Sequence, residues 1–159
     1  MKPYKNLNSS KKKQVEKMFD SISFEYDKLN RLISGGNDVK WRKNIYKIAK
    51  SLNPVDILDI ATGTADIALE LSKIKNSKIT GLDISEKMLD VGRQKVIDRS
   101  LENKVSLISG DAENLSFSKN SFDLISIGFG VRNFQNLEKG LSESFRVLRE
   151  GGTLIIMET

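Results

Sequence analysis

The 159-residue sequence contains no cysteine and no histidine. The absence of cysteine excludes disulfides, thiolate metal sites and a cysteine nucleophile. The absence of histidine excludes serine–histidine triads and imidazole-based zinc sites, so we expect no metal. No apolar run approaches the roughly 20 residues that a membrane-spanning helix needs. Because histidine and cysteine are both absent, any general base must be a carboxylate, a lysine, a tyrosine or a positioned water.

Negative charge is scarce in the first third of the sequence. Residues 1–50 carry 13 Lys/Arg against 5 Asp/Glu, whereas residues 51–159 carry 13 against 16. Such asymmetry can signal attraction to anionic lipid or nucleic acid, although a solvated helical face is the favoured interpretation. Nucleic acid is the least favoured partner, because aromatic residues are not interleaved with the basic ones. We expect a cytoplasmic protein whose basic segment could make peripheral contact with the inner face of the membrane, through Lys11, Lys12, Lys13 and Lys17.

The chain divides into three segments. Residues 1–13 are polar and aperiodic, which predicts disorder. Residues 14–53 carry apolar side chains at helical spacing, which predicts a small helical cap. Residues 54–159 alternate strands with helices, which predicts an α/β fold with a parallel, doubly wound sheet. Five strands are expected, at 55–60, 78–82, 105–108, 122–127 and 153–157.

The fifth of these strands is apolar enough to be central, yet the sequence stops at Thr159. Intact proteins usually cover or blunt an exposed apolar edge, because it promotes aggregation. We therefore expect the sequence to be an N-terminal fragment of a longer protein.

Acidic residues end three of the predicted strands, where an open parallel sheet binds its ligands. Asp59 ends the first strand and is followed by a turn of small residues around Gly63, which lets backbone approach a ligand. Asp83 ends the second strand, 24 residues later, where an acid commonly binds ribose hydroxyls. Asp111 ends the third strand, where a carboxylate could reach an adenine amino group. These positions predict a nucleotide-like ligand.

The ligand is better explained by S-adenosyl-L-methionine than by a dinucleotide. The dinucleotide fingerprint needs three glycines, and here its positions read Ala61, Gly63 and Asp66. Asp66 would also sit at a helix N-terminus, where a pyrophosphate needs free amides. The acids at the strand ends (Asp59, Asp66, Asp83 and Asp111) suit the net positive methyl donor. The alternative, that they are turn formers and helix caps, would be favoured for one Asp but not for the set.

Three further motifs resemble the ubiquinone/menaquinone biosynthesis C-methyltransferase family. They are Tyr26–Asn30 with Ser34–Asp38 and Trp41, then Gly128–Asn133, then Arg146–Gly152. The resemblance implies a Rossmann-like class I methyltransferase fold and methyl transfer from S-adenosyl-L-methionine to a ring carbon of a prenylated quinol, most commonly demethylmenaquinol. It also implies donor-binding residues at Thr64, Asp83, Asp111 and Ala112, and an acceptor-facing segment at Arg132 and Asn133. Two departures from the family pattern are Asp38, where relatives often have His, and Gly128, where some have a donor-binding serine.

Transfer to carbon needs a ring made electron-rich by deprotonation of a quinol hydroxyl. Asp38 is a candidate base, although capping the helix before Trp41 is about as probable. Arg132 would stabilise the developing quinolate, with a salt bridge as the alternative role. Tyr26 and Asp27 are candidates for the acceptor pocket, with a core position on the apolar helical stripe as the alternative for Tyr26.

Three other functions stay open at this stage. A benzoquinol of ubiquinone biosynthesis could replace the naphthoquinol as acceptor. Another small molecule could be the acceptor, with the donor site kept. Finally, the chain could be a donor-binding module without activity.

Overall fold

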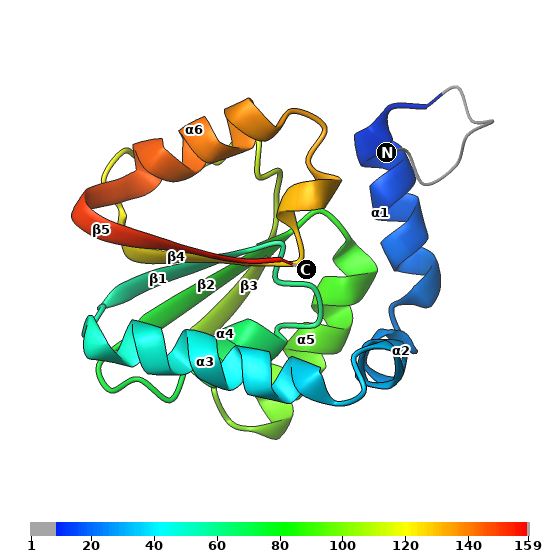
Figure 1. Cartoon of the computed structure of the whole chain (residues 1–159), viewed down its shortest axis with the longest axis horizontal. Coiled ribbons are helices and arrows are strands. Elements are labelled where there is room, and N and C mark those ends of the chain that lie inside the picture. Colours follow the sequence, from blue (N-terminus) through cyan, green and yellow to red (C-terminus); the bar gives the residue numbers. More distant parts are fainter. Residues whose placement is uncertain (1–8, 159) are drawn as a thin grey trace.

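A five-stranded, entirely parallel sheet forms the centre of the molecule (Figure 1). The computed structural model of the chain describes residues 9–158. Hydrogen bonding orders the strands β3-β2-β1-β4-β5. Their bounds are β1 Asp56–Ile60, β2 Lys78–Asp83, β3 Val105–Ser109, β4 Phe122–Gly128 and β5 Leu148–Met157. The predicted Rossmann-like sheet with its five parallel strands is confirmed.

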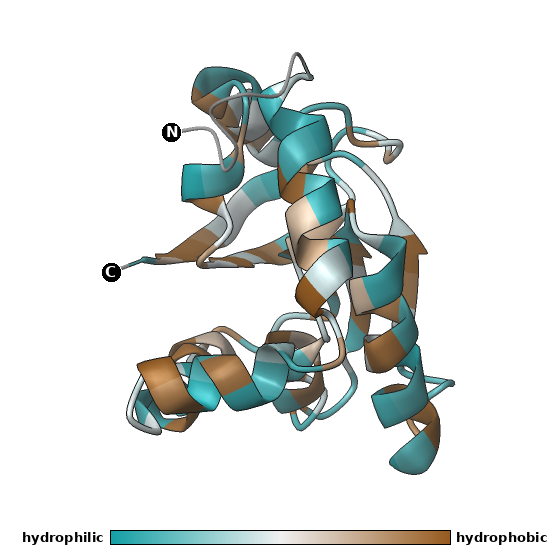
Figure 2. Cartoon of the chain, turned by 90° about the vertical axis from the view of Figure 1, so that its right-hand side faces the viewer, coloured by the Kyte–Doolittle hydropathy of each residue, from teal (hydrophilic) through white to brown (hydrophobic). Residues whose placement is uncertain are grey.

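Helices cover both faces of this sheet. One face carries α3 (Asn37–Ser51), α4 (Asp66–Leu71) and α5 (Glu86–Asp98), and the other carries α6 (Leu137–Val147) (Figure 1). Successive strand residues point to opposite faces, so Ile57 joins the core with α3 and α4 while Leu58 joins the core beside α6. Hydrophobic residues dominate the strands, and the helices carry both hydrophobic and hydrophilic residues (Figure 2). The sheet therefore separates two apolar cores.

Local sequence signals place most element boundaries correctly. Ser85 is the N-cap of α5, as predicted, and its hydroxyl accepts a hydrogen bond from the backbone N–H of Met88 at 3.2 Å. The boundary between α6 and β5 was predicted wrongly. The helix ends at Val147, and the chain is already extended at Leu148, before the glycine pair that was expected to stop the helix. The pairing of β4 with β5 is irregular here: Phe122 pairs with Leu148 and Leu124 with Thr153, so the glycine pair lies in the irregular part of β5.

The N-terminal third supplies helices α1 (Lys11–Ile22) and α2 (Tyr26–Ile33), followed by α3. Residues 1–8 of the predicted disordered segment lie outside the described residues. The prediction is wrong for residues 11–13, because α1 begins at Lys11 with Ser10 as its N-cap. α3 contributes Ile45 and Ala49 to the core of the sheet, so it belongs to the covering layer. None of the helices in residues 9–158 is long and apolar enough to cross a membrane.

The chain order reverses between β1 and β4. From β1 the chain winds outward through β2 to β3, then returns to the other side of β1 as β4 and continues to β5. In open parallel sheets this switch point leaves a crevice beyond the carboxyl ends of the strands.

Candidate functional site

A pocket lies at the carboxyl ends of β1, β2, β3 and β4, beside the first two helices. Every one of these four strands is followed by residues that line it, and α1 and α2 add side chains from the N-terminal third. Six predicted site residues are among the lining residues: Tyr26, Gly63, Asp83, Asp111, Ala112 and Asn133. The structure therefore brings together residues that are more than 100 positions apart in the sequence.

The turn after β1 approaches the pocket with strained backbone. Ala61, Gly63 and Ala65 have φ values of 56°, 56° and 68°, in the left-handed region that alanine rarely adopts. A Cβ on Gly63 would lie 3.2 Å from the methyl carbon of Met88. The Gly63 backbone N–H donates to Asp83 at 2.8 Å, which ties the turn to the end of β2.

Asp59 supports this turn from beneath and does not line the pocket. Its carboxylate is fully buried and accepts hydrogen bonds from the hydroxyls of Thr62 and Ser126, both at 2.6 Å. Burial raises the pKa of Asp59 to about 6, although these two hydrogen bonds oppose the shift. The sequence placed Asp59 among the donor-binding acids at the strand ends. In the structure it lies behind the turn and outside the pocket lining, because it belongs to β1 and its carboxylate is engaged by Thr62 and Ser126.

Asp83 and Asp111 both face the pocket. Asp83 accepts hydrogen bonds from the backbone N–H groups of Gly63 and Ser85, and burial raises its pKa above the usual value. Asp111 accepts a hydrogen bond from the backbone N–H of Glu113 at 2.9 Å. Their positions after β2 and β3 are those that the sequence predicted for contacts to ribose and adenine.

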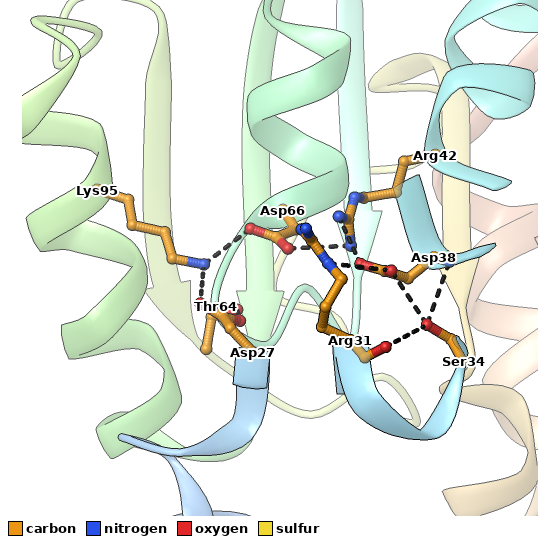
Figure 3. A network of polar contacts seen from close by, with 8 residues as sticks. All are labelled: Asp27, Arg31, Ser34, Asp38, Arg42, Thr64, Asp66 and Lys95. Atoms are coloured by element: carbon orange, nitrogen blue, oxygen red, sulfur yellow. Dashed lines mark hydrogen bonds and ion pairs between the residues drawn. The ribbon is translucent and has the colours of Figure 1, made fainter. Parts of the chain in front are cut away.

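Thr64 lies beside the pocket rather than in its lining. It is 2% exposed, and its hydroxyl donates to Asp27 of α2 at 2.6 Å. The other oxygen of Asp27 pairs with Lys95 of α5 at 2.6 Å, and Lys95 also pairs with Asp66 at 2.7 Å (Figure 3). Thr64 and Asp27 therefore join α2 to the turn after β1.

The same polar network continues to Asp38 (Figure 3). Arg42 pairs with Asp66 at 3.0 Å and with Asp38 at 2.7 Å, and Arg31 pairs with Asp38 at 3.3 Å. Ser34 donates a hydrogen bond to the same carboxylate at 3.0 Å. Burial would raise the pKa of Asp38, but the hydrogen bond from Ser34 and the charge of Arg42 hold it below its usual value. Asp38 lies outside the pocket lining and is a poor proton acceptor, so the structure does not favour the predicted role as base.

Of the three remaining predicted residues, Tyr26 and Asn133 line the pocket and Arg132 does not. Burial raises the pKa of Tyr26, and the negative charges of Asp83 and other acids raise it further. Asn133, in the 3₁₀ helix η1 (Val131–Asn133), lines the pocket with Tyr26. Arg132 is half exposed, lies outside the lining and pairs with Glu158 at 2.9 Å. The salt bridge left open as its alternative role is therefore present.

Two groups of pocket residues were missed from the sequence. Lys11 and Lys12 were assigned to a lipid-facing surface, but Lys11 Nζ donates to the carbonyl oxygens of Arg132 and Phe134 at 2.8 and 2.6 Å. Lys12 lines the pocket and forms an ion pair with Asp111. The sequence carries no signal for these contacts, because they join segments about 100 residues apart. Three lining phenylalanines were also missed (Phe19, Phe129 and Phe134).

Comparison with known proteins decides the family. The sequence profile of the ubiE/COQ5 methyltransferase family matches residues 7–159. The chain belongs to the ubiE/COQ5 methyltransferase family. The demethylmenaquinone methyltransferase of Bacteroides fragilis is 46% identical over 159 residues, which cover 99% of this chain and 64% of that protein. The protein of the same name from Staphylococcus epidermidis is 45% identical over 154 residues, 96% of this chain and 63% of that protein. The chain thus spans somewhat under two thirds of the length of these relatives.

Solved structures confirm the methyltransferase fold. The YcgJ protein of Bacillus subtilis superposes with a TM-score of 0.68 and 27% identity, over 72% of this chain and 48% of that one. A SAM-dependent methyltransferase from Aquifex aeolicus superposes with a TM-score of 0.60 and 25% identity, over 64% of this chain and 55% of that one. Both the family and the fold class predicted from the sequence are confirmed.

Proposed function

We propose that the protein transfers the methyl group of S-adenosyl-L-methionine to a ring carbon of demethylmenaquinol. The observation that carries the proposal is the pocket at the switch point, where Asp83 and Asp111 meet the aromatic residues Tyr26 and Phe129. The relatives named demethylmenaquinone methyltransferase support this choice of acceptor.

The residues at the strand ends fit a donor with net positive charge. Asp83 and Asp111 offer carboxylates at the ends of β2 and β3, and Gly63 allows close approach of the backbone. Acidic groups also surround the Tyr26 hydroxyl closely enough to raise its pKa. A sulfonium and an ammonium group are favoured by such a negative potential, whereas a pyrophosphate is repelled.

The donor supplies an electrophilic methyl group on a sulfonium. The protein must then align the quinol carbon behind that methyl group, and alignment can contribute on the order of 7–11 kcal/mol. One quinol hydroxyl loses its proton as the new carbon–carbon bond forms and the carbon–sulfur bond breaks. The methylated ring carbon then loses its own proton, which restores the aromatic ring, and the oxygen takes up a proton again, so that one proton is released in total. Asp38 is held by arginines, so we assign the first proton to a water in the pocket.

Product analysis tests this proposal directly. The full-length protein is incubated with methyl-labelled donor and either demethylmenaquinol or 2-polyprenyl-6-methoxy-1,4-benzoquinol. We expect label in menaquinol, and we expect Asp83→Ala to abolish it while Phe145→Ala, an exposed position on α6, does not. If donor binds in calorimetry but neither quinol is labelled, the proposed reaction is refuted.

We further propose that the protein reaches this lipid substrate at an anionic membrane surface, through α2 and the turn before it. Phe24, Leu32 and Ile33 are 90%, 77% and 84% exposed, and Lys28 and Arg31 are exposed on the same helix. Apolar side chains flanked by basic ones favour binding at such a surface. Co-sedimentation with phosphatidylglycerol vesicles should fall in Phe24→Ser/Ile33→Ser and persist in Phe145→Ser; equal binding by both variants would contradict the assignment.

A further inference from the structure

Phe129 holds a large side chain in a backbone conformation that suits glycine. It follows β4 with φ of 56°, in the left-handed region that bulky residues rarely adopt. Its two neighbours are glycines that have no room for a side chain. A Cβ on Gly128 would lie 2.2 Å from Ile67 Cδ1, and a Cβ on Gly130 would lie 2.5 Å from Ala61 Cβ. A glycine at position 129 would adopt this φ without strain, so the presence of phenylalanine is not explained by the backbone conformation.

The ring of Phe129 lies in an aromatic and cationic setting at the pocket. It shares the pocket lining with Phe19 and Tyr26, whose rings contact each other edge to face at 6.0 Å. The ring of Trp41 on α3 lies 5.5 Å from the Phe129 ring, centroid to centroid. The guanidinium carbon of Arg132 lies 5.7 Å from the centroid of Phe129. Phe129 therefore lines the pocket, and its ring is held by two side chains, Trp41 and Arg132, that lie outside the lining.

The strand order separates Phe129 from the polar groups that suit the donor. Along the sheet edge, Asp111 follows β3, Asp83 is the last residue of β2, Gly63 lies in the turn after β1, and Phe129 follows β4. A donor that uses the first three positions lies over β3, β2 and β1. The ring of Phe129 is then on the far side of β1, where the acceptor must meet the methyl group.

We propose that Phe129 is a specificity residue that supports the flat aromatic ring of the acceptor, an inference that rests on the proposed function. Aromatic rings attract one another in offset or edge-to-face contact, which an aliphatic side chain does not reproduce. The contacts of Trp41 and Arg132 hold the Phe129 ring in place before the acceptor arrives. The strained backbone at residue 129 is the cost of placing a ring at this point of the pocket.

The single tryptophan of the chain provides a direct readout, because Trp41 lies against Phe129. The 159-residue chain, saturated with S-adenosylhomocysteine, is titrated with 1,4-naphthoquinone while Trp41 fluorescence is recorded. We expect saturable quenching whose Kd rises about 10-fold in Phe129→Gly and recovers in Phe129→Tyr. The same rise should appear in the KM for demethylmenaquinol. The Kd for S-adenosylhomocysteine should be unchanged, and the Tm of Phe129→Gly should not fall, because glycine relieves the strain.

Each alternative role has a distinct outcome. If Phe129→Gly weakens S-adenosylhomocysteine and leaves naphthoquinone binding unchanged, Phe129 serves the donor and the proposal is overturned. A lowered Tm with equal losses in every parameter would show a structural role and overturn it as well. Phe145→Ala is the matched control, an exposed phenylalanine remote from the pocket lining, and it should change nothing. Selective loss of naphthoquinone binding with no methylation of demethylmenaquinol by the wild type would refute the proposed reaction and keep this role.

Discussion

The buried carboxylate of Asp59 makes the stability of the fold depend on pH in an unusual direction. Its pKa is about 6 in the folded protein, against 3.8 in the unfolded chain. Between these values the folded state keeps the proton and the unfolded state does not. Folding stability therefore falls as pH rises from about 4 to about 6, and the loss is complete above the folded pKa. At 1.36 kcal/mol per pH unit, the full change is about 3 kcal/mol.

The substitution Asp59→Asn removes this titration and keeps the shape of the side chain. The free energy of unfolding is measured by urea denaturation of wild type and variant between pH 4 and pH 7, without donor. The difference in the free energy of unfolding between wild type and variant at a single pH is not decisive. In the wild type the hydroxyls of Thr62 and Ser126 both donate to the carboxylate, and the amide group of the variant must face one of them. The decisive quantity is the change of that difference with pH.

We expect the wild type to lose about 2 kcal/mol relative to Asp59→Asn between about pH 4 and pH 7, with the steepest loss near pH 5; the rest of the full change lies below pH 4. Other titrating groups occur in both proteins and largely cancel. Asp83 is the nearest exception, since its charge contributes to the raised pKa of Asp59. Parallel stability curves for the two proteins would refute the reasoning that the carboxylate is buried without a compensating cation.

Three further substitutions probe other charges. Asp123→Asn should show the opposite pH dependence. Burial raises the pKa of Asp123, but backbone hydrogen bonds and Arg149 hold it below 3.8. In urea unfolding the wild type should therefore be more stable than the variant above about pH 4, and this difference in the free energy of unfolding should shrink below pH 4. Lys12→Ala should lower the Kd for S-adenosylhomocysteine about 2- to 5-fold in calorimetry, because Lys12 competes for Asp111; weaker binding would contradict this. Lys95→Met should lower the free energy of unfolding by about 1–2 kcal/mol, because it leaves two carboxylates without their shared cation, and an unchanged urea midpoint would count against it.

The fold was largely predictable because its signals are local. Apolar runs such as Ile57–Ile60 mark buried strands, and Ser85 marks the start of α5. The start of β5 was predicted wrongly because pairing with Phe122 draws Leu148 into the sheet ahead of the glycines. Tertiary pairing overrides the local signal at that point.

The site was predictable only where the sheet itself places the residues. Asp83 and Asp111 reach the pocket because they end strands, and the carboxyl ends of parallel strands meet at one edge. Lys12 and Asp38 depend on which helix packs against which loop, and spacing along the chain carries no such information. Asp38 therefore pairs with arginines, whereas Lys12, from a segment predicted to be disordered, reaches Asp111.

The same contacts sharpen the electrostatic argument for a cationic donor. The sequence contains four acids at the strand ends, but Asp66 is neutralised by Lys95 and Arg42, and Asp59 is buried behind the turn with its pKa raised to about 6. Among the ion pairs of residues 9–158, Asp83 has no cationic partner, and the partner of Asp111 is Lys12 of α1. Selection for positive charge therefore rests on two carboxylates, and one of them is already paired with Lys12. A ligand group that binds the Oδ2 atom of Asp111 competes with the ammonium group of Lys12 for that atom, which is the physical reason for the effect expected of Lys12→Ala.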